Sequence, residues 1–309
     1  MLSNELRYFF AVATTGSLST ASGQLYVAGS AISRQIQKLE TRLGVILFER
    51  HARGMILTDA GQILANHVRK SMRDMEFAMA EIQGLKAVRK TLVRLACTDG
   101  MAFDLLPGLL ARFRLLHPGV SFDFQVGSAV QVAEWIRRND CDVAFQFSLA
   151  PERDVEIIAA WPAPVLLLLD CAHPLMQQPG VVMEDLHHYP LVLPEAGTTL
   201  RQLFDLSCRM TGTFLEPAFS SNNFSALYGF TRHTPDAITV CSHFSVLWRA
   251  PQDGMTLKAI SNASLSQRTL QIQVPGSKHR PAAVNTFLEL TSQALDEEHK
   301  QWMEKLAGA

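Results

Sequence analysis

The sequence predicts a multidomain α/β protein in which a small helical domain and one long helix precede a larger region of strands and helices. Three observations lead to this prediction. Apolar residues of the first 58 positions recur at helical spacing, and residues 58–86 continue this spacing without a proline. After residue 90, short apolar runs alternate with helical segments, which favours mostly parallel sheets covered by helices.

Composition indicates that the two ends of the chain have different partners. The chain has 309 residues, which favours two or three domains, and 48% of them are hydrophobic. Residues 1–90 contain 12 Lys and Arg against 7 Asp and Glu, whereas the remaining residues contain 16 against 22. A basic N-terminal segment followed by an acidic remainder predicts a polyanion-binding module joined to a different second region.

Cysteine, histidine and leader patterns exclude several classes of protein. The five cysteines are scattered without a CxxC pair, which predicts reduced thiols in a cytoplasmic protein. No signal peptide and no apolar run of membrane-spanning length is found, so we expect no membrane segment. The histidines lack zinc spacing, and we predict neither a metal nor another cofactor.

The first 58 residues contain the pattern of a helix-turn-helix. A helix ends at the glycine of "TTGS", a second covers about 18–25, and a third covers about 30–42 after a turn that contains Gly29. The third helix has an apolar face, so its polar residues point outward. A hairpin, Gly44–Leu57, follows it directly and has arginines near its tip.

This arrangement predicts binding to double-stranded DNA. Short polar and long basic side chains at the start of an exposed helix reach base edges in the major groove, and Arg34 suits a bidentate contact to guanine. Arginines of a hairpin suit phosphates or a narrow minor groove. The candidate DNA-binding residues are Ser30, Ser33, Arg34, Gln35, Lys38, Arg50 and Arg53.

A long helix is predicted from Thr58, its N-cap, to about residue 86. Its apolar residues follow a 4-3 spacing, which fits either packing on its own domain or pairing with the same helix of a second copy. We favour pairing because the helix joins two domains. The candidate dimerisation residues are Leu64, Val68, Met75, Ala78, Ile82 and Leu85.

The rest of the chain predicts two α/β subdomains with a cleft between them. Strands are expected near 92–97, 120–126, 141–147, 164–169, 190–194, 236–241 and 268–274, and helices near 104–116, 129–138, 198–211, 223–232 and 281–305. Open α/β sheets bind ligands where strands feed helices. The candidate effector-binding residues at such places are Thr98, Asp99, Gly100, Ser128, Phe147, Gly197, Thr198, Thr199, Asn223 and Ser242.

The chemistry of the expected ligand depends on two features. Backbone N–H groups and threonine hydroxyls at Gly197–Thr199 suit a carboxylate or another small anion. Asp99, if it faces the cleft, favours an amine or a polyol instead, and the sequence leaves its direction open. An enzyme is not expected, because the chain has no GxSxG, GxGxxG or P-loop motif.

The chain resembles a known family over almost its whole length. Residues 1–65 contain "FFAVATTGSLSTAS", "AISRQIQKLE", "LGVILFER" and "LTDAG" in the order found in the N-terminal domain of LysR-type transcriptional regulators. Looser agreement follows in "LLPGLLARFRLLHPGV", "CDVAFQF", "AHPL" and "EDLHHYPLV". The chain is therefore identified as similar to this family. The similarity is strong in the N-terminal domain and weaker in the rest of the chain.

The resemblance implies a domain plan and partners. It implies a winged helix-turn-helix at 1–58, a dimerising linker helix at 59–90, and an effector-binding region at 91–309 similar to periplasmic binding proteins. Subdomain I would be about 91–163 with 268–309, and subdomain II about 164–267. It also implies a homodimer or homotetramer on an inverted-repeat operator, a small-molecule effector and contact with RNA polymerase.

Two departures from the family pattern carry predictions of their own. Ala28-Gly29-Ser30 replaces a frequent Ser-Gln-Pro, which predicts an altered operator preference with Ser30 as the N-cap of the third helix. "TRHTPDAITVCSHF" at 231–244 replaces a glycine-rich turn near the expected cleft. This second departure supports the alternative of a constitutive DNA-binding regulator with a vestigial cleft.

Overall fold

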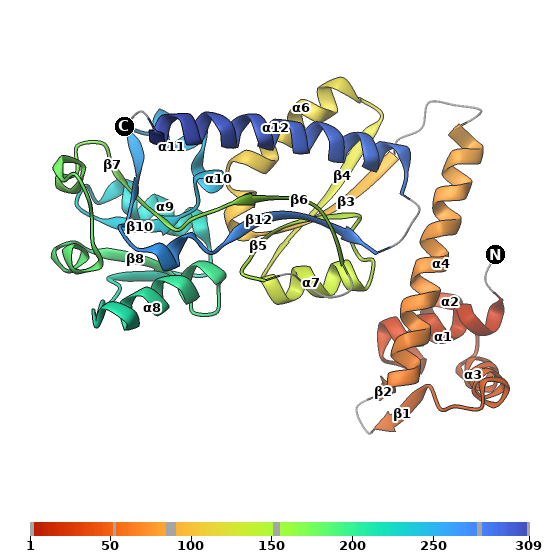
Figure 1. Cartoon of the computed structure of the whole chain (residues 1–309). Coiled ribbons are helices and arrows are strands. Elements are labelled where there is room, and N and C mark those ends of the chain that lie inside the picture. The colour runs from red at the N-terminus through yellow and green to blue at the C-terminus, as the bar shows by residue number, and fades with distance from the viewer. Residues whose placement is uncertain (1–2, 52–53, 85–90, 151–154, 277–279, 308–309) are drawn as a thin grey trace. The chain divides into compact units, whose positions relative to one another are not determined.

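The chain forms two compact units, residues 1–89 and 90–309. A computed structural model describes residues 3–51, 54–84, 91–150, 155–276 and 280–307 (Figure 1). In the described part of the chain, no helix is long and apolar enough to cross a membrane.

The first unit is a bundle of helices with a two-stranded hairpin. Its elements are α1 (Asn4–Thr15), α2 (Leu18–Leu25), α3 (Gly29–Leu43), β1 (Phe48–His51), β2 (Gly54–Leu57) and α4 (Asp59–Gly84). β1 and β2 pair antiparallel. Helix α1 ends at Gly16, whose φ of 64° is left-handed and therefore suits glycine. The core joins all three short helices, the hairpin and α4, and its buried residues are Phe9, Val12, Ala21, Ile32, Ile36, Leu39, Leu47, Phe48, Ala65 and Val68.

The first half of helix α4 packs in this core. Thr58 Oγ1 accepts a hydrogen bond from the Gly61 N–H at 3.0 Å, as the predicted N-cap requires. Val68 is fully buried in the core of its own unit, which contradicts its assignment to the dimerisation stripe. Leu64 also packs against this core. A buried side chain already surrounded by its own domain has no surface left for a second helix.

The second half of α4 has a different surface. Met75 is 43% exposed, and Ala78 is exposed as well. Of the other two stripe residues, Ile82 is described in its backbone only and Leu85 lies outside the described residues. Met72 and Met79 add two further exposed methionines to this half of the helix.

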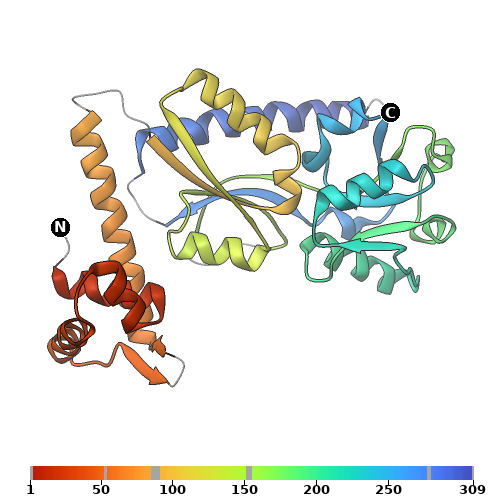
Figure 2. The ribbon, with the colours of Figure 1, turned by 180° about the vertical axis from the view of Figure 1, so that it is seen from behind.

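The second unit contains two five-stranded sheets (Figure 2). The first has the order β4-β3-β5-β12-β6, with β3 (Thr91–Thr98), β4 (Val120–Gly127), β5 (Val143–Ser148), β6 (Val155–Pro162) and β12 (Thr269–Pro275). Helices α6 (Leu105–Leu116) and α12 (Ala282–Ala307) cover one face, where Phe113, Phe145 and Phe287 share a core. Helix α7 (Ala129–Arg137) covers the other face.

The second sheet has the order β11-β7-β10-β8-β9, with β7 (Leu166–Asp170), β8 (Leu191–Pro194), β9 (Phe219–Ser221), β10 (Ile238–Cys241) and β11 (Met255–Ala259). One face is covered by α8 (Thr199–Thr211) and the 3-10 turns Pro174–Gln177, Met183–His188 and Ala263–Ser266. The other face is covered by α9 (Phe224–His233), α10 (His243–Val246) and α11 (Arg249–Gln252). Helix α5 (Asp99–Ala102) follows β3 in the first subdomain.

Both sheets are mixed, which corrects the expectation of mostly parallel sheets. β3 pairs parallel with β4 and β5, but β12 pairs antiparallel with β5 and β6. In the second sheet β8 has parallel neighbours and β7 has antiparallel ones. The cause is that the chain crosses between the sheets twice. The two crossing segments bond to each other, from Ala163 N to Arg268 O at 2.8 Å and from Val165 N to Leu265 O at 2.9 Å.

Candidate functional site

Helix α3 presents a polar face to solvent. Because Ile32, Ile36 and Leu39 are buried, Ser30, Arg34 and Lys38 are exposed, and Ser33 and Gln35 are half-buried. Within the described residues, Arg34 has no ion-pair partner. The guanidinium is therefore available to a base edge or a phosphate.

Two further cations of α3 share one carboxylate. Glu5 of α1 is buried, and its carboxylate lies 2.8 Å from Arg42 and 3.5 Å from Lys38. Both basic side chains are still more than half exposed, so each has donors left for a phosphate. The shared carboxylate thus holds Lys38 and Arg42 near the same point of α1.

The start of α3 differs from the expectation. Its N-cap is Ala28, not Ser30, and no side chain caps the helix. Gly29 takes the first helical position, so the helix begins two residues earlier than a Ser30 cap allows. The preceding turn contains Tyr26, which has a left-handed φ of 54° and is 96% exposed. Sequence reasoning passed over Tyr26 because an aromatic residue normally predicts core.

Backbone N–H groups of the hairpin and of the residue before it donate hydrogen bonds to the helices and the turn after α1. Glu40 of α3 accepts hydrogen bonds from the N–H groups of Leu47 (2.8 Å) and Phe48 (3.3 Å). On the second strand, the Met55 N–H donates to the Gly16 carbonyl at 2.8 Å. Only the backbone of Arg50 is described, and Arg53 lies outside the described residues. The base of the wing is therefore bonded to α3 through Glu40 and to the end of α1 through Gly16.

A cavity of about 650 Å³ lies between the two subdomains of the second unit. Residues from both sheets line it. The structure places there Thr98, Asp99, Gly100, Ser128, Phe147, Gly197, Thr198, Thr199 and Asn223, nine of the predicted effector-binding residues. Ser242, the tenth, is not part of the lining, because its side chain is fully buried at the start of α10.

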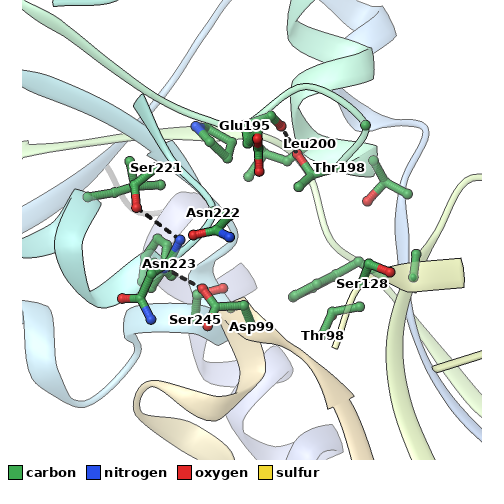
Figure 3. A pocket seen from close by; sticks show the side chains of 18 of the residues that line it. Thr98, Asp99, Ser128, Glu195, Thr198, Leu200, Ser221, Asn222, Asn223 and Ser245 are labelled. Atoms are coloured by element: carbon green, nitrogen blue, oxygen red, sulfur yellow. Dashed lines mark hydrogen bonds between the residues drawn. The ribbon is translucent and has the colours of Figure 1, made fainter. Parts of the chain in front are cut away.

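Strand ends and helix N-termini position the polar groups of the lining (Figure 3). Ser128 caps α7 and forms a capping box with Gln131. Thr198 caps α8 through the Arg201 N–H at 3.1 Å, and Asn223 caps α9 through the Ala226 N–H at 3.1 Å. Three helix N-termini therefore meet at the cavity, and their partial positive charge favours an anion.

Asp99 reaches across the cavity to the opposite subdomain. Its carboxylate accepts a hydrogen bond from the Phe224 N–H, in the first turn of α9 (Figure 3). Burial raises the pKa of Asp99 from its usual value, and the Phe224 N–H opposes that rise. The orientation that the sequence left open is thus settled. The charge of Asp99 is engaged with α9 rather than offered freely to a ligand.

Arg268 is a lining residue that sequence reasoning missed. It is 2% exposed, and its Nε donates to the Ala163 carbonyl at 3.0 Å. Its guanidinium carbon lies 4.4 Å from the ring centroid of Phe147, a cation–π distance. Burial lowers the pKa of Arg268 to about 10, which still leaves it charged near neutral pH. Glu195 and Ser245 also line the cavity without having been predicted.

Comparisons with known proteins identify both units. The family model described as "LysR substrate binding domain" matches residues 86–296. The model described as "Bacterial regulatory helix-turn-helix protein, lysR family" matches residues 3–62. The transcriptional activator CmpR of Synechocystis sp. is 30% identical over 64% of this chain and 65%, just under two thirds, of CmpR. The dual regulator GltC of Bacillus subtilis is 28% identical over 94% of this chain and 96% of GltC.

Solved structures share the fold. A full-length OxyR variant from Pseudomonas aeruginosa gives a TM-score of 0.67 at 20% identity over 94% of each chain. CbnR in complex with its target DNA gives 0.61 at 20% identity over 95% of this chain and 99% of CbnR. Because one family model covers more than half of the chain and a second covers its N-terminal unit, the chain belongs to the LysR family of DNA-binding transcriptional regulators with an effector-binding domain.

Proposed function

We propose that this chain switches transcription when a small molecule occupies the cavity between its two subdomains. The observation that carries the proposal is the cavity itself, whose walls come from both sheets. A ligand that touches both walls binds best to one relative orientation of the subdomains, so it shifts the population toward that orientation. In an oligomer this shift changes the geometry of the DNA-binding domains, and with it the contact to RNA polymerase.

For the DNA-bound state we propose that α3 enters the major groove and the wing contacts the neighbouring backbone or minor groove. The exposed side chains of Arg34 and Ser30 support base contacts, and Lys38 supports a phosphate contact. Arg50 and Arg53 remain proposed wing contacts. The absence of a side-chain cap on α3 leaves its first N–H groups available to a phosphate.

We also propose that α4 pairs with the α4 of a second copy, in a homodimer or homotetramer on an inverted repeat. Met72, Met75 and Met79 are exposed at spacings of three and four residues, which places them on one side of the helix. This row replaces the predicted stripe, whose first half is occupied by the core of the domain.

Replacement of Arg34 tests the DNA contact. Arg34→Ala should weaken binding by roughly 1–3 kcal/mol and relax the preference at one base pair, because a bidentate contact to guanine is lost. Fluorescence anisotropy on a duplex selected by the wild-type protein from a random pool measures both effects. Arg112→Ala, an exposed change on α6, is the control and should leave affinity unchanged. Equal affinity of the Arg34 variant for all duplexes tested would contradict the assignment of α3.

A ligand screen tests the effector site. Metabolites that bind the native state raise the melting temperature by mass action. Each hit is then added to a footprint of the protein on its selected duplex. A changed footprint supports a ligand-responsive regulator. Ligand binding without a change in the footprint would favour the constitutive regulator with a vestigial cleft. So would the absence of any ligand binding while DNA affinity is intact.

A further inference from the structure

Arg268 is part of a wall of the cavity that crosses three neighbouring strands. It immediately precedes β12, Phe147 lies near the end of β5, and Thr98 ends β3. Since the strand order is β3-β5-β12, these three side chains come from adjacent strand ends, and all three line the cavity. We call Thr98, Phe147 and Arg268 the Arg268 wall.

Two polar atoms of this wall are unsatisfied. Arg268 Nη2 and Thr98 Oγ1 are both buried and have no hydrogen-bond partner. In the part of the chain that the structure describes, no carboxylate lies within ion-pair distance of Arg268. A buried cation without a counter-charge is costly, because it has lost its water and gained no equivalent partner. Such a group is the place to look for a ligand that supplies the missing charge.

Phe147 and Ala163 fix the guanidinium in place. The ring of Phe147 covers one face of it, at 4.4 Å from centroid to carbon, and the Ala163 carbonyl takes the Nε–H. With a face and one N–H engaged, the remaining N–H donors on the edge are held in one orientation. Fixed parallel N–H donors match the two oxygens of a carboxylate.

The other charged residues of the lining do not supply this partner. They are Asp99 and Glu195. Asp99 accepts from the Phe224 N–H, and Glu195 is exposed. Neither residue pairs with Arg268. The Arg268 wall is therefore the cationic part of a cavity whose own acids are directed elsewhere.

We propose that the ligand of this cavity is a small organic carboxylate, whose anionic group pairs with Arg268 and accepts a hydrogen bond from the hydroxyl of Thr98. This inference rests on the proposed function, because it names the chemistry of the ligand at the same site. Arg268 also bonds to Ala163 on the other crossing segment, so the bound anion acts at the junction of the two subdomains.

Matched pairs of probes test the charge requirement on the full chain. The probes are acetate against acetamide and benzoate against benzamide, each with sodium chloride added to equal ionic strength. Calorimetric melting temperatures are measured for the wild type, Arg268→Met, Arg268→Lys and the surface control Arg112→Met. In the wild type, a carboxylate should raise the melting temperature and its amide should not.

The variants locate the effect. Arg268→Met should weaken carboxylate binding by at least about 30-fold, since the anion would then be buried without a partner. Arg268→Lys should retain part of the carboxylate binding, and Arg112→Met should retain all of it. The comparison within each variant is between two probes, so a change in the stability of the ligand-free variant does not obscure it.

Three results would overturn the inference: amides that stabilise as well as carboxylates, no stabilisation by either carboxylate, or a carboxylate effect that persists in Arg268→Met. The proposed function fails differently. If only neutral metabolites bind and alter the footprint, the proposed regulatory function is supported and the proposed carboxylate ligand is wrong. If carboxylates bind through Arg268 and the footprint stays the same, the anion site stands and the regulatory proposal falls.

Discussion

One buried residue of the effector region, His243, stays neutral at mildly acidic pH, where a histidine in solvent is protonated. His243 is fully buried in α10, and its Nε2 lies 3.3 Å from His299 Nδ1 on α12. The ring of Trp302 stacks on it at 5.1 Å and 7°. Burial, followed by the charges of His299 and Arg268, lowers the pKa of His243 to about 3. His243 therefore stays neutral in the folded protein.

This lowered pKa predicts a pH dependence of stability. Below the unfolded pKa of about 6.5 the unfolded chain takes up a proton at His243 that the folded chain refuses, so stability falls as the pH falls from 6.5 toward 3. The loss should approach about 1.4 kcal/mol per pH unit from this residue. Urea unfolding of the wild type and His243→Phe at pH 7, 6 and 5 measures it.

His243→Phe should have the shallower dependence, because it keeps an aromatic ring on Trp302 and removes the titrating group. His299 on α12 remains in the variant but loses its contact with His243 Nε2, so the difference between the two proteins reports the His243–His299 pair. His187→Gln, an exposed change, is the control and should follow the wild type. Parallel curves for wild type and His243→Phe would show that His243 is not a buried neutral group.

At the scale of elements, the wing depends on two glycines. Gly54 has a φ of 135°, and an added Cβ would lie 2.5 Å from the Gly16 carbonyl oxygen, which accepts the Met55 N–H. Gly54→Ala should therefore cost about 1–3 kcal/mol of stability and displace the wing, which lowers DNA affinity. Gly23→Ala is the matched control: nothing lies within 4 Å of its Cβ, and alanine favours a helix, so stability should rise. Thermal unfolding that ranks the two variants in the opposite order would contradict this account.

The linker helix carries a second prediction at this scale. Met75→Glu should weaken self-association, because it places a charge within the exposed row of Met72, Met75 and Met79. Ile63→Glu is the control. Ile63 is 72% exposed but lies nine residues from Met72, half a turn away at 3.6 residues per turn. Analytical sedimentation at several protein concentrations should show that Met75→Glu dissociates and that Ile63→Glu does not. Equal association of both would place the interface elsewhere.

How far the sequence predicts these elements depends on whether the signal is local. The helices of the first unit and the strand ends at Thr98 and Ser128 follow from periodicity and capping, which are local properties. Val68 shows where prediction from a single sequence fails. Its spacing fits both a domain core and a dimer interface, and only its tertiary contacts show that it belongs to the core. Strand β6 was missed, and its antiparallel partner β12 is far away in the chain.

Arg268 was missed for a similar reason. A lone arginine before an alternating strand reads as a surface charge, since arginine is rarely buried. Its burial depends on Phe147 and Ala163, neither of which is near it in sequence. The same holds for Asp99, whose partner Phe224 lies on the opposite subdomain. Side chains that join distant segments are the ones that carry the site, and a single sequence does not record these contacts.

At the scale of the effector region as a whole, two crossing segments and several hydrogen bonds join the two subdomains. Asp104 accepts from the Trp248 and Arg249 N–H groups at 2.8 Å, and a further contact lies in the cavity. The crossings bond to each other through Ala163, Val165, Leu265 and Arg268. The contact across the cavity is the Asp99 carboxylate on the Phe224 N–H. Since the crossings lie at the junction and Asp99 lies in the cavity, this hydrogen bond resists opening more directly than any bond within one subdomain.

Removing the Asp99 carboxylate should therefore favour the open form. Asp99→Ala leaves the Phe224 N–H without its acceptor and should lower stability by about 1 kcal/mol, whereas Asp99→Asn keeps an acceptor oxygen and should lose less. Hydrogen exchange of the Phe224 amide should accelerate in the alanine variant, because its protection depends on closure. Asp142→Ala is the control, since Asp142 bonds to the Arg94 N–H at 2.7 Å within one subdomain. That variant should lose stability without a faster Phe224 amide. If Asp99→Ala left this amide as protected as in the wild type, closure would have to rest on the crossing segments and on the hydrogen bonds of Asp104 with the Trp248 and Arg249 N–H groups.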